Sequence, residues 1–124
     1  FGKDIYIDEG CYFTQPNLIV LDDFVRINRD AKIYGSGGVW IGRHVLVGPN
    51  CFIHSANHII KNSSEAIYEK GYLKEKVFIG DLSLISANVS ILPGANIGNG
   101  SFMACGAIVT KGNYQEGSIL NLGF

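Results

Sequence analysis

A chain of 124 residues with 47% hydrophobic content is long enough to bury a core of its own. Its formal net charge of -1 argues against nucleic acid or an anionic membrane surface as the main partner. No apolar run approaches the length that is needed to span a bilayer, so we expect no membrane span.

Large apolar residues recur along nearly the whole chain at a spacing of six. This period fits neither the 3.6-residue turn of an amphipathic helix nor the simple alternation of a strand, and it is typical of a repeat whose unit is a short strand and a turn. The pattern therefore predicts an all-β repeat fold. Its fourteen anchors are Ile7, Phe13, Leu21, Ile27, Ile33, Ile41, Val47, Ile53, Ile79, Ile85, Ile91, Ile97, Met103 and Val109.

Two further positions of each six-residue unit support this interpretation. Three residues after the anchor, Gly, Asn or Asp is common, and these residues most readily adopt the left-handed conformation of a tight turn. Four residues after it the side chain is small or modest, which suits a second inward position at a crowded corner. The residues predicted to point inward there are Cys11, Asn17, Val25, Ala31, Gly37, Val45, Cys51, Asn57, Ser83, Val89, Ala95, Ser101, Ala107 and Asn113.

Three steps of the pattern are longer than six, and their order indicates a three-sided prism. The steps Phe13–Leu21 and Ile33–Ile41 are eight residues long, and the step Ile53–Ile79 is twenty-six. They fall at every third unit, so all three insertions are expected to leave the prism at the same corner on successive coils. Fourteen units then give nearly five coils, roughly 22 Å of prism at about 4.7 Å between strands.

The pattern resembles that of the hexapeptide-repeat acyltransferases, which fold as a left-handed parallel β-helix. We therefore expect an all-β, left-handed parallel β-helix of about five triangular coils, forming a single domain over residues 1–124 with one long loop at about residues 55–76. The left-handed sense comes from the resemblance alone, because such crossovers are normally right-handed. The chain begins with Phe1 and stops on the apolar Leu122–Phe124, so we expect its ends to be incomplete.

The residues just before the anchors are predicted to face outward, and most of them are apolar. So much apolar surface is rare on a monomer, although β surfaces tolerate some, and we expect subunits or ligand to cover it. Enzymes of the resembled family are trimers of prisms with active sites between adjacent subunits, which implies a homotrimer here. The ten apolar residues are Tyr6, Tyr12, Val20, Trp40, Leu46, Phe52, Phe78, Leu84, Phe102 and Ile108.

A histidine stands where the chain leaves the prism for the long loop. The segment Val47–His58 is similar to the stretch in galactoside, maltose, xenobiotic and surface-polysaccharide acetyltransferases where a histidine follows Gly or Asn at the base of an extended loop. By that resemblance His58 is the general base that deprotonates an acceptor hydroxyl as it attacks the thioester of acetyl-CoA. Imidazole also suits this task chemically, because its ordinary pKa of about 6.5 lets it accept a proton near neutral pH.

Two further histidines raise the alternative of a zinc site. The β-helical carbonic anhydrases bind zinc on a related prism through three histidines contributed by two subunits. The positions of His44, His54 and His58 do not match that family's widely separated histidine followed by a closely spaced pair, so we expect no metal. His44 lies in a predicted turn, where solvent is its expected surrounding.

Asn28 has two interpretations of equal weight. It aligns, unit by unit, with an asparagine that in the resembled acetyltransferases lies near the catalytic histidine across the subunit boundary. It is equally well explained as a polar residue that ends a strand after Ile27.

The C-terminal coils resemble those that line the acetyl-CoA groove of the family. In that groove small residues let the pantetheine arm lie against the backbone, and a Thr-Lys pair sits near the adenosine and its phosphates. By position, these roles fall to Ala87, Cys105, Thr110 and Lys111. A cationic lysine is a suitable phosphate partner.

The groove departs from the family pattern at three places. Leu84 stands where a tryptophan is usual, so an aromatic wall is missing, and Cys105 replaces a smaller residue and narrows the space. The usual Gly-x-Pro-Ala-Lys ending is absent at Leu122–Phe124. We expect acetyl-CoA to bind, either more weakly or with the help of residues beyond this sequence.

The three cysteines show no metal-ligand spacing, and their odd number gives no disulfide framework. Cys11 and Cys51 occupy predicted inward positions, where a free cysteine behaves as a small hydrophobic residue. Cys105 is expected in a turn. A reducing cytoplasm is the simplest compartment for such a protein.

These features predict a trimeric acetyltransferase that moves acetyl from acetyl-CoA to a hydroxyl of a saccharide, most directly one destined for a surface polysaccharide. Transfer is expected to be direct, because no nucleophile paired with a base is visible. The nearest alternative is an N-acetyltransferase of an amino-sugar nucleotide. More remote alternatives are a zinc protein like the carbonic anhydrases and a non-catalytic β-helix scaffold.

Overall fold

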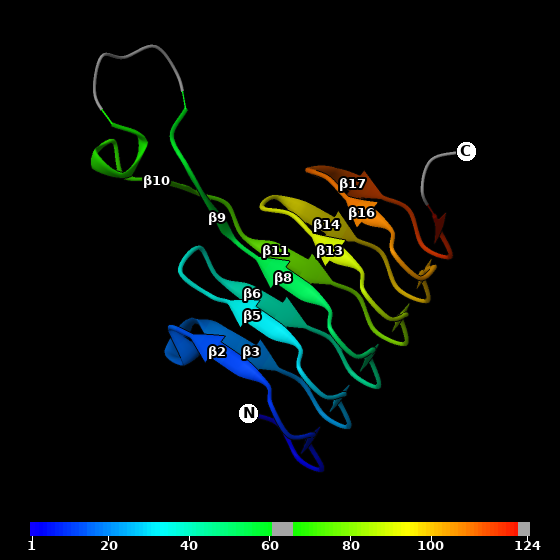
Figure 1. Ribbon diagram of the computed structural model, residues 1–124. Helices are drawn as coiled ribbons and strands as arrows, with labels where there is room; N and C mark the ends of the chain where they lie inside the picture. Colours follow the sequence, from blue (N-terminus) through cyan, green and yellow to red (C-terminus); the bar gives the residue numbers. More distant parts are fainter. Residues whose placement is uncertain (61–65, 122–124) are drawn as a thin grey trace.

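The computed structural model describes residues 1–60 and 66–121, and it is a stack of coils with three parallel sheets as its sides (Figure 1). Sheet 1 consists of β1 (Tyr6–Ile7), β4 (Arg26–Ile27), β7 (Leu46–Val47), β12 (Leu84–Ile85), β15 (Phe102–Met103) and β18 (Ile119–Leu120). Sheet 2 consists of β2 (Tyr12–Thr14), β5 (Lys32–Tyr34), β8 (Phe52–His54), β13 (Ser90–Ile91) and β16 (Ile108–Val109). Sheet 3 consists of β3 (Ile19–Leu21), β6 (Val39–Ile41), β11 (Val77–Ile79), β14 (Ala95–Ile97) and β17 (Gly112–Tyr114).

Each coil contributes one strand to each sheet, in the order sheet 1, sheet 2, sheet 3. The described residues form five such coils, and β18 begins a sixth. We number the coils 1 to 5 from the N-terminus and name the corners by the sheets they join, as corner 1–2, corner 2–3 and corner 3–1. Two short 3-10 helices, η1 (Pro16–Leu18) and η2 (Ile67–Glu69), lie in the longer units. No helix in the described part of the chain is long and apolar enough to cross a membrane.

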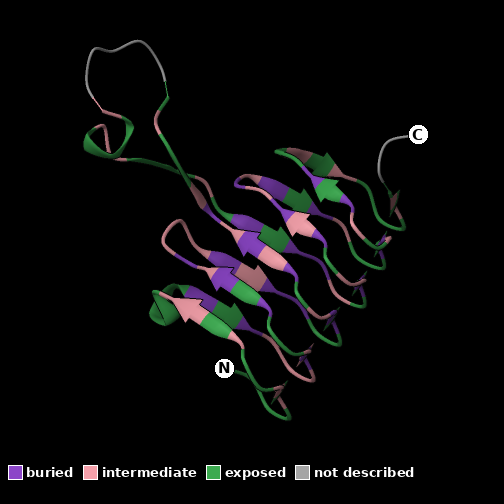
Figure 2. Ribbon diagram, viewed as in Figure 1, coloured by how far each residue is buried: buried purple, intermediate pink, exposed green. Residues whose placement is uncertain are grey.

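The anchors form the core, as predicted. Parallel pairing places them directly over one another, for example Ile33 opposite Ile53 and Ile53 opposite Ile91 in sheet 2. The anchors from Leu21 to Val109 are at most 2% exposed, whereas the residue before each anchor points outward, so buried and exposed positions alternate along the strands (Figure 2). The predicted outward direction of the ten apolar residues is confirmed.

The repeat continues beyond the last predicted anchor, and one set of inward positions differs from the prediction. Tyr114 and Leu120 continue the columns of anchors, opposite Ile97 and Met103, but the step from Val109 to Tyr114 is five residues and breaks the period. At corner 2–3 the predicted inward residues Asn17, Asn57 and Asn113 are exposed, and Gly37 is half-buried. The buried position there lies two residues before the next anchor, at Ile19, Val39 and Val77, because each insertion precedes that strand.

The interior predicts a marked asymmetry between two truncations. Ile91 is fully buried between Ile53 and Val109. Ile91→Ala should therefore lower the free energy of unfolding by about 2–5 kcal/mol, since it leaves a cavity in a stack that cannot collapse locally. Leu82→Ala, at an exposed turn position, is the matched control and should change it by no more than about 0.5 kcal/mol. Urea unfolding followed by circular dichroism measures both, and similar shifts for the two variants would contradict the packing described.

Candidate active site

The long insertion leaves the prism at corner 2–3 and forms an arm (Figure 1). We use this name for the described residues of the insertion, 55–60 and 66–76; residues 61–65 of the predicted loop lie outside the described residues. Its base is an antiparallel ribbon of β9 (Ala56–His58) and β10 (Tyr72–Lys74), in which His58 lies opposite Tyr72 and Ala56 opposite Lys74. The two shorter insertions leave at the same corner, as predicted, two coils below the arm after Thr14 and one coil below it after Tyr34.

His58 is exposed on β9, and an aromatic ring rather than a carboxylate lies against it. The imidazole centroid is 4.7 Å from that of Tyr72, with the planes tilted by 33°. Within the described residues no hydrogen bond fixes the histidine side chain. His58 also lines a hollow of about 250 Å³ together with Ile59, Ile60 and Leu73. The imidazole can therefore accept a proton from a molecule that enters from solvent.

A second hollow lies beneath the arm at the same corner. Its volume is about 410 Å³, and its lining combines residues of both shorter insertions with residues of the arm. Tyr72 belongs to this hollow and contacts the His58 ring, so the two features adjoin each other. The residues that line it are Thr14, Gln15, Tyr34, Ser36, Ala56, Tyr72 and Lys74. No motif in the sequence marks these residues individually, but the stacking of the three insertions at one corner brings them together.

The six predicted site residues divide between two corners. Asn28, Ala87 and Cys105 lie at corner 1–2, where the N–H of Gly106 donates to the carbonyl of Ala87 over 3.0 Å and so joins coils 4 and 5. His58, Thr110 and Lys111 belong to corner 2–3. Sheet 2 separates the two groups, so one chain alone does not bring Asn28 to His58.

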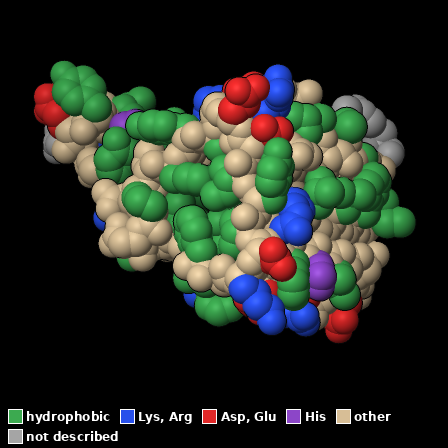
Figure 3. All heavy atoms as spheres, turned by 90° about the horizontal axis from the view of Figure 1, so that it is seen from below, with side chains coloured by type: hydrophobic (Ala, Val, Ile, Leu, Met, Phe, Trp, Pro, Cys, Tyr) green, Lys and Arg blue, Asp and Glu red, His purple; other side chains and the backbone are tan. Residues whose placement is uncertain are grey.

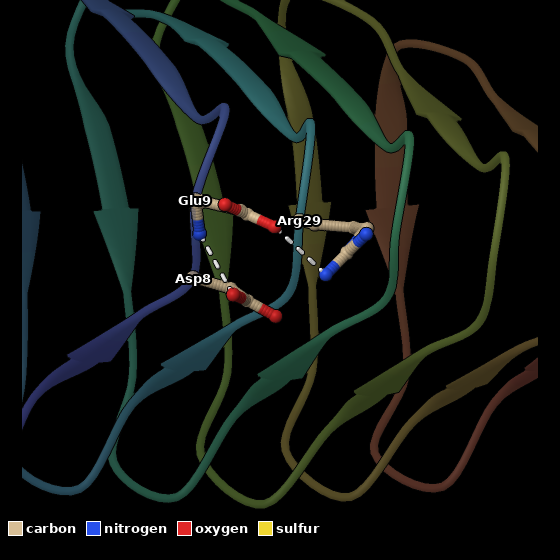
Figure 4. A network of polar contacts seen from close by, with 3 residues as sticks. All are labelled: Asp8, Glu9 and Arg29. Carbon is tan, nitrogen blue, oxygen red and sulfur yellow. Dashed lines mark hydrogen bonds and ion pairs between the residues drawn. The ribbon is translucent and has the colours of Figure 1, made fainter.

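Asn28 sits in a corner with several interactions. Its N–H donates to the carbonyl of Val47 over 2.9 Å, and its own carbonyl accepts from the Cys11 thiol over 3.1 Å. The next residue, Arg29, pairs with Glu9 of the coil below at 3.0 Å, and Asp8 accepts the N–H of Glu9 over 2.8 Å (Figure 4). The Arg29 and Glu9 side chains are largely exposed, so this ion pair contributes little stability.

Lys111 is held by a residue of the arm. Its Nζ lies 2.6 Å from Oε2 of Glu75, and the backbone N–H of Glu75 donates to the carbonyl of Ser55 over 2.8 Å. Gly94 leaves room for this ion pair, because a Cβ at that position would lie 2.9 Å from Cγ of Lys111 and 3.1 Å from Oε2 of Glu75. Glu75 therefore joins the arm to coil 5 through its side chain.

The cysteines and the remaining histidines occupy separate environments. Cys51 is buried, and burial raises the pKa of its thiol, whereas Cys105 is exposed in its turn as predicted. His44 is exposed at corner 3–1 and stacks on Phe24, with ring centroids 4.6 Å apart. The residues that the structure describes include no group of three or more His, Cys, Asp or Glu able to hold a metal ion. The zinc alternative therefore gains no support.

Comparisons with known proteins agree with this architecture. No family model matches the sequence. Galactoside O-acetyltransferase from Lactococcus lactis is 30% identical over 114 residues, which cover 89% of this chain and 45% of that protein. A hexapeptide-repeat acetyltransferase from Vibrio cholerae, solved with acetyl coenzyme A, has a TM-score of 0.86 at 22% identity over 98% of this chain and 64% of that one. The resemblance to the hexapeptide-repeat acetyltransferases is confirmed.

A second solved structure, a maltose O-acetyltransferase from Clostridium difficile, gives the same TM-score of 0.86 at 24% identity, over 98% of this chain and 63% of that one. The left-handed parallel β-helix predicted for this chain is thus confirmed as its fold. The chain spans about half the length of the curated relatives it matches. The predicted departure from the hexapeptide-repeat pattern at residues 122–124 lies outside the described residues.

His54 predicts how stability depends on pH. It is half-buried beside Phe52, and burial lowers the pKa of its imidazole below the ordinary 6.5, while a hydrogen bond with the Ala56 backbone opposes the shift. Below pH 6.5 the unfolded chain therefore binds a proton that the folded chain does not, and stability is lost as the pH falls through the folded-state pKa.

His54→Gln should remove this contribution. Melting temperatures measured between pH 7.5 and pH 5 should fall less steeply for the variant than for the wild type. His44→Gln, which changes an exposed histidine, is the control and should keep the wild-type slope. An unchanged slope in His54→Gln would contradict the role of burial.

Proposed function

We propose that this protein transfers an acetyl group from acetyl-CoA to a hydroxyl of a saccharide. The observation that carries the proposal is the position of His58, an accessible imidazole at the base of the arm, adjoining a polar hollow and on the same corner as Lys111. The similarity to galactoside O-acetyltransferase and to other acetyltransferases supports the same chemistry.

In the proposed reaction His58 acts as the general base. Its neutral imidazole nitrogen accepts the proton of the acceptor hydroxyl while that oxygen attacks the thioester carbonyl carbon. His58 then returns the proton to the departing thiolate sulfur, so one acetyl ester and one thiol are formed from one alcohol and one thioester. The Tyr72 ring restricts the rotation of the imidazole in place of a carboxylate partner. General base assistance of this kind contributes roughly 10² to 10⁴ in rate.

The proposed acetyl-CoA contacts lie at corner 1–2 and at corner 2–3. Acetyl-CoA supplies the activated acyl group as a thioester. Ala87 and Cys105 would offer a small-residue surface for the pantetheine, and Thr110 and Lys111 would contact the phosphates. Leu84 is 40% exposed on the outer side of sheet 1 and adds an aliphatic rather than an aromatic neighbour.

We further propose a homotrimer, because a single chain separates Asn28 from His58 by the width of sheet 2. A neighbouring prism would place its own Asn28 near His58 and would cover outward apolar residues. Figure 3 shows hydrophobic side chains over much of one face, with charged groups between them and at its edges. Five of the six outward residues of sheet 1 are apolar and exposed, which suits such a contact; they are Tyr6, Leu46, Leu84, Phe102 and Ile119. Three free thiols suit a reducing compartment such as the cytoplasm.

Replacement of His58 tests the mechanism. His58→Ala should reduce acetyl transfer to sugar acceptors by at least about a hundredfold while oligomeric mass and acetyl-CoA binding stay unchanged. His44→Ala, at corner 3–1, is the matched control and should retain activity. A screen of sugar and amino-sugar acceptors, followed by release of the CoA thiol, provides the measurement. Full turnover by His58→Ala would exclude the assigned base, and transfer to amines alone would favour the N-acetyltransferase alternative.

Lys111 provides a separate test of the acetyl-CoA side. Lys111→Met should raise the dissociation constant of CoA about tenfold, because a charge-assisted contact to phosphate is lost. Glu75→Gln removes the competing carboxylate and should leave affinity unchanged or raise it. Calorimetric titration with CoA measures both, with Lys3→Met as a control for the loss of a distant positive charge. Equal affinity of the Lys111→Met and wild-type proteins would remove Lys111 from the proposed site.

A further inference from the structure

The hollow beneath the arm is lined by four polar side chains that have no partner among the described residues. Among the described residues, nothing forms a hydrogen bond or ion pair with the side chains of Thr14, Gln15, Ser36 or Lys74. Two hydroxyls, an amide and an ammonium can together donate and accept several hydrogen bonds. A hollow with this lining suits a ligand rich in hydroxyl groups.

The backbone at Gln15 is strained at the edge of this hollow. Its φ and ψ angles are 50° and 54°, in the left-handed region, where Gly, Asn and Asp are the usual residues. The side chain gives η1 no capping hydrogen bond that would offset the cost, which is about 1–2 kcal/mol. Seven other described non-glycine residues share a positive φ, so this conformation is common at the turns of the fold. At Gln15 it accompanies a side-chain amide that lines the hollow and has no hydrogen-bond partner among the described residues.

Two aromatic rings border the same hollow, and each contacts a neighbouring ring of the protein. Tyr34 contacts the Tyr12 ring at 6.1 Å and the Phe52 ring at 4.9 Å, both edge to face. Tyr72 contacts the His58 ring at 4.7 Å. The C–H faces of a pyranose pack well on such rings, and a sugar against Tyr72 would lie next to the proposed base.

The charge of the hollow comes from one lysine, and its chain neighbours do not neutralise it. Three consecutive charged residues end the arm: Lys74 lines the hollow, Glu75 is bound by Lys111 at 2.6 Å, and Lys76 lies 5.8 Å from the centroid of the Trp40 ring. The described residues of the lining include no carboxylate. Among the described residues, Lys74 is thus the member of the three without a partner, and no acidic side chain of that set faces it in the hollow.

We propose that this hollow binds an acidic sugar residue, a hexuronic acid, and that Lys74 selects its carboxylate. The assignment rests on the proposed acetyl transfer and names the acceptor class of that site. A single ammonium balances the single charge of a carboxylate, whereas a phosphate monoester carries nearly two negative charges near neutral pH. The tyrosines, the hydroxyls and the Gln15 amide then bind the ring and its remaining hydroxyls.

The experiment compares acceptors that differ only in the carboxylate. Acetyl transfer to p-nitrophenyl β-glucuronide and to p-nitrophenyl β-glucoside is followed by release of the CoA thiol. The wild type should prefer the glucuronide by about tenfold in kcat/KM, mainly through KM, as expected for one charge-assisted hydrogen bond. Lys74→Met should abolish the preference, and Lys74→Glu should reverse it. Lys3→Met, at corner 3–1, removes the same charge elsewhere and should leave the preference intact.

Binding of the two glycosides, measured by calorimetry without acetyl-CoA, separates this inference from the proposed function. Binding of the glucuronide that is lost in Lys74→Met supports the acidic-sugar site even if no acetyl transfer occurs, in which case the proposed function fails alone. Equal kcat/KM and equal binding of the two glycosides by the wild type would overturn the inference, and so would an unchanged preference for the glucuronide in Lys74→Met. Neither result would contradict the proposed acetyl transfer.

Discussion

In-register stacking of inward side chains is the constraint on which the rest of the structure depends. Parallel strands pair residue by residue, so each anchor lies over the anchor of the previous coil, as Ile33, Ile53 and Ile91 do. A strand that slipped by one residue would turn its apolar set outward. Extra residues are therefore accommodated only between strands, at a corner. Insertions between the same two sheets stack along one edge, and the candidate active site is built on that edge.

The same constraint explains how far the fold could be predicted from the sequence. A period of six repeated over many units specifies the three sheets, the core and the corner of the arm. The prediction failed where local spacing changes, since the five-residue step before Tyr114 hides the last two anchors. It also placed Asn17 and Asn57 inward, because it counted forward from the preceding strand. The strand that follows the insertion determines the buried position, which is occupied by Ile19 and Val77.

Residues of the candidate site could be predicted only where they belong to the six-residue repeat or directly follow a regular stretch of it. His58 stands at the end of a regular stretch and Lys111 within one, so the pattern marks both. The hollow combines two short insertions with the far end of a long one, and no spacing rule relates Tyr72 or Lys74 to His58. That relation comes from antiparallel pairing within the arm, which sets Tyr72 opposite His58. The ion pair of Glu75 and Lys111 likewise joins residues from different coils.

Strand alternation links the two sides of the proposed reaction through one short segment. Successive side chains of an extended chain point in opposite directions, and at the end of the arm this separates Lys74, in the hollow, from Glu75, against Lys111. The N–H of Glu75 also donates to the carbonyl of Ser55 over 2.8 Å, and the carbonyl of Glu75 accepts from the N–H of Gly94 over 3.3 Å. The strand that carries Tyr72 to His58 is thus bonded to coil 4 at Gly94, and the Glu75 side chain reaches Lys111 of coil 5. One peptide unit separates the proposed acceptor-binding lysine from the residue that holds the proposed phosphate-binding lysine, so the arm positions both sides of the proposed site against the same prism.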